Sequence, residues 1–191
     1  QLLISECNGS NLYFKNDFDI VIISKCQNCE IFIPIAKRIV FIEHCNNCQI
    51  TVISSTIILS NVVDSIIYSC SQYPLFLLGE ISNLQLGPFN TNLKDIHKKL
   101  KDSFIIINDE SRNYFRNPFQ FYEFQQFIDP FQNNWSVISE SQFELLYLPK
   151  EFEHLSYNDL IQDSHSLKLV ISEIIDILKL EDKDTSENIF I

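Results

Sequence analysis

The chain has 191 residues, of which 46% are apolar, and its 14 Lys and Arg against 25 Asp and Glu give a net charge of −11. This length and apolar fraction are enough for one or two hydrophobic cores, and no apolar run is long enough to span a membrane. Because so acidic a chain lacks the positive surface that holds a phosphate backbone, we expect no nucleic-acid partner.

The first 92 residues contain a repeat with a period of about nineteen. Two series of residues mark it, each at intervals of nineteen: Cys7, Cys26 and Cys45, then Ser10, Cys29 and Cys48. Runs in which apolar and β-branched residues alternate lie between the marks, at 30–34, 38–43, 49–53 and 56–60. A fixed repeat of this length indicates a solenoid, and alternation with period two indicates strands. The sequence therefore predicts an all-β core, a parallel β-helix over residues 1–92 with one coil per repeat.

The cysteines allow a second interpretation. Two CxxC pairs, at 26–29 and 45–48, are separated by fifteen residues, a spacing typical of zinc ribbons. The rest of the repeat carries no equivalent pair, and stacked coils place corresponding positions about 4.8 Å apart without a metal. We therefore expect buried structural thiols in a cytoplasmic protein, with no metal and no other cofactor. A zinc-dependent scaffold stays the alternative, and it would unfold on chelation.

Residues 93–150 are predicted to form a capping helix followed by an irregular segment that packs on the β-helix. Asn92 has the character of a helix cap, and Leu93, Ile96 and Leu100 would share one face of the helix that follows. This helix is expected to cover the open end of the solenoid. Residues 151–191 are predicted to form an acidic helical extension, in which apolar residues follow a helical period from 166 to 180.

Several separated motifs resemble one known family. They are CQNCEIFI at 26–33, VFIEHCNNC at 40–48, LQLGPFN at 84–90 and NNWSVI at 133–138. Together they are similar to the C-CAP/TBCC domain of the tubulin-folding cofactor C-like proteins, over roughly residues 10–140. The resemblance implies a right-handed parallel β-helix, which agrees with the fold that the repeat predicts.

The resemblance also implies a catalytic residue that this chain lacks. The family's GTPase activators carry an arginine on an outward-facing strand, after a Gln-Gln-apolar triplet, and insert it into the partner's nucleotide site. When the coils are aligned on Cys45 and Cys48, the two glutamines fall on Ser55 and Thr56 and the arginine falls on Ile58. Isoleucine offers a phosphate neither charge nor hydrogen-bond donors. We therefore predict that the chain is not an enzyme and has no catalytic residue.

The missing arginine points to a second branch of the family, the TBCC-domain-containing proteins of centrosomes and basal bodies. LGPFNT at 86–91 and SQFELLYLP at 141–149 are similar to segments of that branch. The resemblance implies a cytoskeleton-associated binding module that acts in microtubule organisation and organelle positioning, located in the cytoplasm at the centrosome or basal body. The expected partners are proteins of these structures, among them tubulin or an Arf-like GTPase. The alternative is a GTPase-activating protein for tubulin or an Arf-like GTPase.

Four residues are predicted to contact the partner. Thr56 and Ile58 lie on the strand that corresponds to the family's arginine strand. Arg38 is expected one coil earlier, on the strand beneath Ile58, where it is the nearest substitute for the missing charge. Asn90 belongs to the Pro-aromatic-Asn-Thr turn that follows the last coil.

Overall fold

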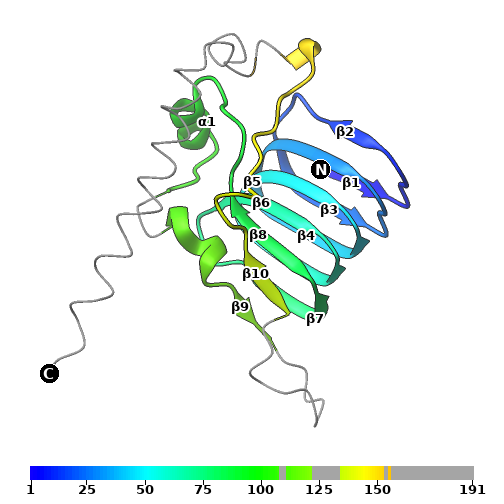
Figure 1. Cartoon of the computed structure of the whole chain (residues 1–191). Coiled ribbons are helices and arrows are strands. Elements are labelled where there is room, and N and C mark those ends of the chain that lie inside the picture. The colour runs from blue at the N-terminus through cyan, green and yellow to red at the C-terminus, as the bar shows by residue number, and fades with distance from the viewer. Residues whose placement is uncertain (108–110, 122–133, 153–154, 156–191) are drawn as a thin grey trace, which may run out of the picture.

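The computed structural model describes residues 1–107, 111–121, 134–152 and 155. These residues form a parallel β-solenoid of about five turns, in which the chain winds from the N-terminal coil to β10 (Figure 1). Every strand pairing is parallel, in the order β1-β3-β4-β5-β6-β8-β10, with β2 on β4, and β7 between β5 and β9. The predicted parallel β-helix is confirmed.

The strands differ widely in length because two of them continue around corners of the coil. They are β1 (Leu2–Ser5), β2 (Asn11–Tyr13), β3 (Phe18–Ser24), β4 (Glu30–Asn46), β5 (Gln49–Val63), β6 (Ile66–Ser71), β7 (Phe76–Ser82), β8 (Leu84–Pro88), β9 (Phe119–Gln120) and β10 (Trp135–Val137).

The core fills the inside of the solenoid, because alternate side chains of each strand turn inward. Val40 and Ile42 of β4 are fully buried, and they pair in register with the equally buried Ile57 and Leu59 of β5. The same stacking runs through all the coils and joins the inward side chains into one hydrophobic cluster.

At two corners of each coil, one residue adopts the left-handed backbone conformation, with a positive φ angle. Lys25 and His44 occupy the first corner with φ of 54° and 52°, and Asn28 and Asn47 occupy the second with φ of 53° and 49°. Asparagine suits the second corner because it tolerates this conformation better than most residues do. Its side chains also link neighbouring coils: Asn47 Nδ2 donates to Asn28 Oδ1 at 2.8 Å, and Asn28 Nδ2 donates to Asn8 Oδ1 at 3.0 Å.

The predicted capping helix exists, but it lies along the side of the coils. The helix α1 spans Ile96–Asp102, and the residue before it is Asp95, with φ of 56°, rather than the expected Asn92. Ile96 and Leu100 pack on a second apolar cluster that contains the outward-facing Phe32. Figure 1 shows α1 beside the stack of coils rather than across its end. The expectation that it covers the open end is therefore wrong.

The segment expected to be irregular contributes to the solenoid instead. The 3₁₀ helix η1 (Ser111–Arg116) contacts β6 and β8 and places Phe115, which is 2% exposed, in the interior cluster. Strand β9 pairs with β7, and β10 pairs with β8, so the winding continues beyond residue 92. A short 3₁₀ helix η2 (Lys150–Phe152) follows. The predicted helix at 166–180 lies outside the described residues.

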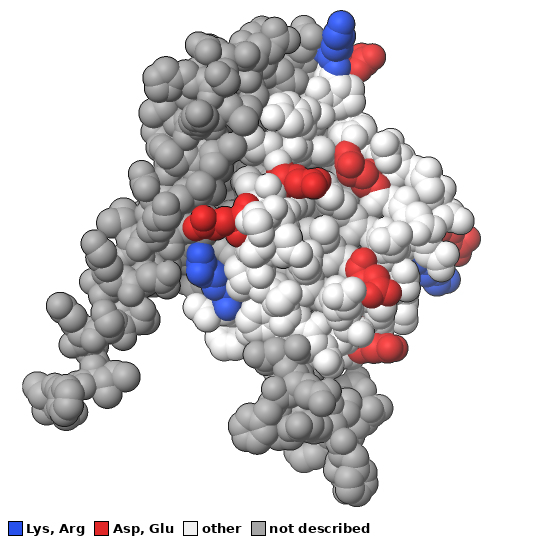
Figure 2. Space-filling model, viewed as in Figure 1, with Lys and Arg blue, Asp and Glu red and all other residues white. Residues whose placement is uncertain are grey.

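One side of the described surface is poor in positive charge. On the side seen in Figure 2, acidic side chains are scattered over the coils, with few basic ones among them. No helix in the described ranges has the length and apolar character that a membrane crossing requires; α1 has only 7 residues.

Candidate partner-binding face

The solenoid has two broad faces, which differ in what covers them. We call them the Ile58 face and the Tyr68 face. The outward side chains of β1, β3, β7, β9, residues 36–43 of β4 and residues 54–60 of β5 form the Ile58 face. The outward side chains of β2, β6, β8, β10, residues 30–33 of β4 and residues 49–53 of β5 form the Tyr68 face.

Residues 89–107 and 138–152, which we call the flanking segment, cover the Tyr68 face. Phe32, Thr51 and Tyr68 are equivalent outward residues of three successive coils, and none is more than 1% exposed. Phe143 packs edge-on against Tyr68, with ring centroids 5.8 Å apart, and Asn90 bonds to Thr51. This face is therefore part of the protein's interior.

The Ile58 face carries a continuous apolar row across six strands. Ile58 pairs in register with Phe41 on one side and with Phe76 on the other. The complete row, one residue per strand, is Leu3, Ile22, Phe41, Ile58, Phe76 and Phe119. Five strand spacings make it roughly 24 Å long.

Much of this row is open to solvent. Leu3 is 65% exposed, Phe119 57% and Phe41 37%, whereas the other three members are partly exposed. A second row beside it contains Ile20, Ile39 and Thr56, paired in the same way. A contiguous exposed apolar surface on a folded protein is typical of an interaction site.

Thr56 and Ile58 lie where the sequence places them, on one outward face of one strand. Both are partly exposed, while Ile57 between them points into the core and is fully buried. The residue at the position where the resemblance implies an arginine is therefore presented outward, but with an aliphatic side chain between two aromatic ones.

Arg38 does not lie beneath Ile58, contrary to the prediction. The residue at that position is Phe41, three places further along β4, which corresponds to about 10 Å. A register shift in the β4–β5 pairing lies between Ala36 and Ile39, next to Arg38. The Arg38 guanidinium instead contacts the Asp19 carboxylate at 3.5 Å, with both side chains more than half exposed.

Asn90 is fully buried, so the prediction that it contacts a partner is wrong. Its Oδ1 accepts a hydrogen bond from Thr51 Oγ1 at 2.9 Å, and its Nδ2 donates to the Glu144 carbonyl at 2.9 Å. The backbone N–H of Leu146 also donates to the Asn90 carbonyl at 2.9 Å. Asn90 thus ties the flanking segment to the Tyr68 face.

The cysteines line the inside of the two corners. Each buried thiol donates to the backbone carbonyl two residues earlier, as Cys26 does at 3.4 Å, Cys29 at 3.1 Å and Cys48 at 3.3 Å. Burial raises the pKa of Cys26, so its thiol resists ionisation. Within the described ranges, no three His, Cys, Asp or Glu side chains gather closely enough to hold a metal ion.

The sequence analysis missed the aromatic end of the Ile58 face. The ring of Phe76 stacks with those of Phe119 and Phe121, with centroids 5.9 Å and 6.0 Å apart. The available signal was the alternation Phe119-Gln120-Phe121, which has the same period of two as the other strands.

Comparison with known proteins agrees with this architecture. The family model described as "Tubulin binding cofactor C" matches residues 1–121. The solved structure of tubulin binding cofactor C from Leishmania major superposes with a TM-score of 0.60 at 16% identity, covering 78% of this chain and 99% of that one. No curated protein sequence matches the chain.

Proposed function

Because the chain belongs to the tubulin binding cofactor C family, we propose that it is a docking module that binds a cytoskeletal protein through its Ile58 face and does not accelerate GTP hydrolysis. The single observation that supports this proposal is the uninterrupted apolar row through the position where the resemblance implies an arginine. That row suits hydrophobic contact with a folded partner and has nothing to offer a phosphate.

Arg38 is a poor substitute for the missing arginine. It lies about 10 Å along the strand from the position beneath Ile58, and a carboxylate already neutralises it. An arginine finger in GTPases is worth roughly 10³–10⁵ in rate because it stabilises charge in the transition state. A misplaced and paired guanidinium does not supply that charge.

The partner's own surface should be flat and largely uncharged where it meets the Ile58 face. A β-solenoid presents a rigid array of side chains, so binding costs it little conformational entropy. The family points to tubulin or an associated GTPase as the partner, and the branch resemblance points to centrosomes or basal bodies as the location.

The catalytic half of the proposal is tested by single-turnover GTP hydrolysis on tubulin and on an Arf-like GTPase. We expect no acceleration by the natural chain. Ile58→Arg is the informative variant, because it restores the family's residue at an outward position, and acceleration by it would show that the GTPase-docking geometry is intact. Acceleration by the natural chain would refute the proposal, and loss of that activity in Arg38→Gln would then identify the arginine responsible.

The binding half is tested by the affinity of Phe41→Asp for tubulin, measured by biolayer interferometry. Binding can bury only the exposed 37% of Phe41, which is worth about 0.5–1 kcal/mol, and the substituted carboxylate would also lose its hydration in the interface at a cost of about 1 kcal/mol, so the affinity should fall by roughly tenfold. Phe104→Asp is the matched control, because Phe104 is 89% exposed and lies outside the Ile58 face. Equal losses from the two variants, or none from Phe41→Asp, would exclude this face as the binding surface.

A further inference from the structure

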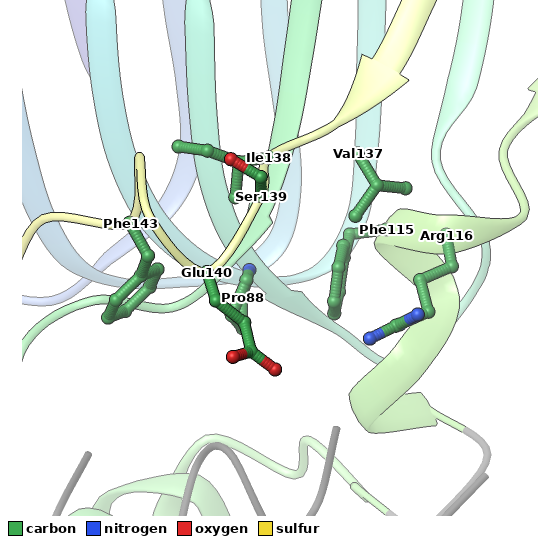
Figure 3. A pocket seen from close by; sticks show the side chains of 8 residues that line it. All are labelled: Pro88, Phe115, Arg116, Val137, Ile138, Ser139, Glu140 and Phe143. Carbon is green, nitrogen blue, oxygen red and sulfur yellow. The ribbon is translucent and has the colours of Figure 1, made fainter. Parts of the chain in front are cut away.

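A cavity of about 210 Å³ lies near the last coil, apart from the Ile58 face. One wall is η1, with Phe115 and Arg116, next to Val137 at the end of β10, and the opposite wall is the segment after β10, with Glu140 and Phe143 (Figure 3). The volume is below that of drug-sized pockets, which begin at about 300 Å³, and corresponds to a ligand of about ten heavy atoms or fewer. The proposed function assigns no role to this cavity.

Arg116 brings an unused hydrogen-bond donor to the cavity. Its Nε is buried and has no hydrogen-bond partner among the described residues. The guanidinium lies 5.5 Å from the centre of the Phe115 ring, and Phe115 is itself anchored in the core. The stacked ring restrains the cation, so its open donors face a defined direction. Because Nε is closed to solvent, a ligand carboxylate would meet the two terminal nitrogens of the guanidinium, which can donate to it as a pair.

Glu140 supplies the opposite charge to the same space. Its side chain is exposed, and Figure 3 shows its carboxylate and the Arg116 guanidinium on the same side of the group of lining residues. Among the ion pairs of the described residues, none joins Glu140 to Arg116. A ligand with only negative charge would be repelled by Glu140, and one with only positive charge by Arg116.

We propose that this cavity binds a small zwitterion, an α-amino acid with an apolar side chain. Its carboxylate accepts hydrogen bonds from Arg116, and its ammonium group donates to Glu140. Its side chain packs between Pro88, Val137 and Phe143, which supply apolar walls. Both charges of the ligand are then neutralised by groups that have no partner of their own in the described structure.

The test is isothermal titration of the full chain with leucine, N-acetylleucine and leucinamide. We expect leucine to bind, and the two blocked compounds to bind at least about tenfold more weakly, since each lacks one charge-assisted contact. Arg116→Gln should abolish leucine binding. Glu140→Gln should remove the preference for leucine over N-acetylleucine.

Arg38→Gln is the control, because it removes an exposed arginine on the Ile58 face and should leave leucine binding unchanged. Arg116→Lys keeps the positive charge but not the bidentate donor pair, and it should also weaken binding by about tenfold. A melting curve for each variant separates lost binding from lost folding. The proposal is overturned if leucine at about 10 mM, tenfold above a dissociation constant of about 1 mM, gives no heat of binding. It is also overturned if N-acetylleucine binds as tightly as leucine.

Discussion

Replacing Asn90 by leucine tests whether this residue is an internal tie or a partner contact. Leucine keeps the branched shape and the number of heavy atoms but removes both side-chain hydrogen bonds. The Thr51 hydroxyl is then left unpaired in a site that is 1% exposed, and the Glu144 carbonyl loses its donor. The backbone bond from Leu146 to the Asn90 carbonyl remains available.

The expected cost follows from the burial of the two contacts. Leaving the buried Thr51 hydroxyl unsatisfied costs about 2 kcal/mol, and losing the more solvated contact to Glu144 costs about 1 kcal/mol. The free energy of unfolding should therefore fall by about 3 kcal/mol. For a chain of this size, that corresponds to a fall in melting temperature of about 6–12 °C.

Urea denaturation of three variants measures the effect. Thr51→Val alone should cost about 1–2 kcal/mol, and the double variant should cost less than the sum of the single ones, because two unpaired groups disappear together. Affinity for a partner at the Ile58 face should not change in the folded fraction. A stability loss below about 0.5 kcal/mol for Asn90→Leu, or strictly additive costs, would refute the account of Asn90 as a buried tie.

Two further predictions concern the corners of the coils. The contribution of Cys26 to the free energy of unfolding should fall as pH rises above about 8.5, where its thiol ionises in the unfolded chain. Burial raises the pKa of Cys26 in the folded protein, so this residue is protonated in both states below that pH and only the unfolded state releases its proton above it. Cys48 acts in the opposite direction, because its hydrogen bond with Cys45 lowers its pKa to about 7. The effect of Cys26 is therefore measured as a difference: in urea titrations from pH 7 to 10, the natural chain should lose more stability above about pH 8.5 than Cys26→Val does. Asn47→Ala should lower the free energy of unfolding by about 1–2 kcal/mol, because alanine at φ of 49° is strained and the bond to Asn28 is lost. Asn47→Gly, which loses only the bond, is its control, and an equal melting temperature for the two would contradict the strain argument.

The winding of the chain could be predicted from its sequence because inward positions must repeat. Cys26 and Cys45 occupy equivalent inward sites at one corner, and the alternation along β4 identifies the core residues directly. Spacing and alternation are local properties, so they can be recognised in the sequence without knowledge of the fold.

The error over Arg38 arose from the length of one coil. Counting back nineteen residues from Ile58 reaches Ile39, beside Arg38, but the structure pairs Ile58 with Phe41, only seventeen residues earlier. That coil is two residues shorter, and the pairing shifts register near Ala36. Irregularities of this kind depend on how neighbouring coils pack, so a repeat period alone does not reveal them.

The positions of β9, α1 and Asn90 could not be predicted from the sequence for a related reason. Strand β9 has two residues and exists only because β7 offers it a free edge. The apolar side of α1 shows that the helix packs on something, but not on which surface. From the sequence, Asn90 resembles an exposed turn residue. Its hydrogen bonds to Thr51 and to Glu144, which is 54 positions away, are visible only in the structure. Each case is decided by long-range contacts that override the local signal.

Ile58, at the position where the resemblance implies an arginine, differs from such a residue in more than one charge. A lone exposed isoleucine would need no explanation, but Ile58 lies between Phe41 and Phe76, and the apolar row continues to the last strand on each side. An arginine at 58 would place a charge in the middle of that row, and an apolar partner would have to desolvate it. The row and the isoleucine are therefore parts of one surface, and the apolar side chain that offers a phosphate no charge at position 58 also makes this face suitable for hydrophobic docking.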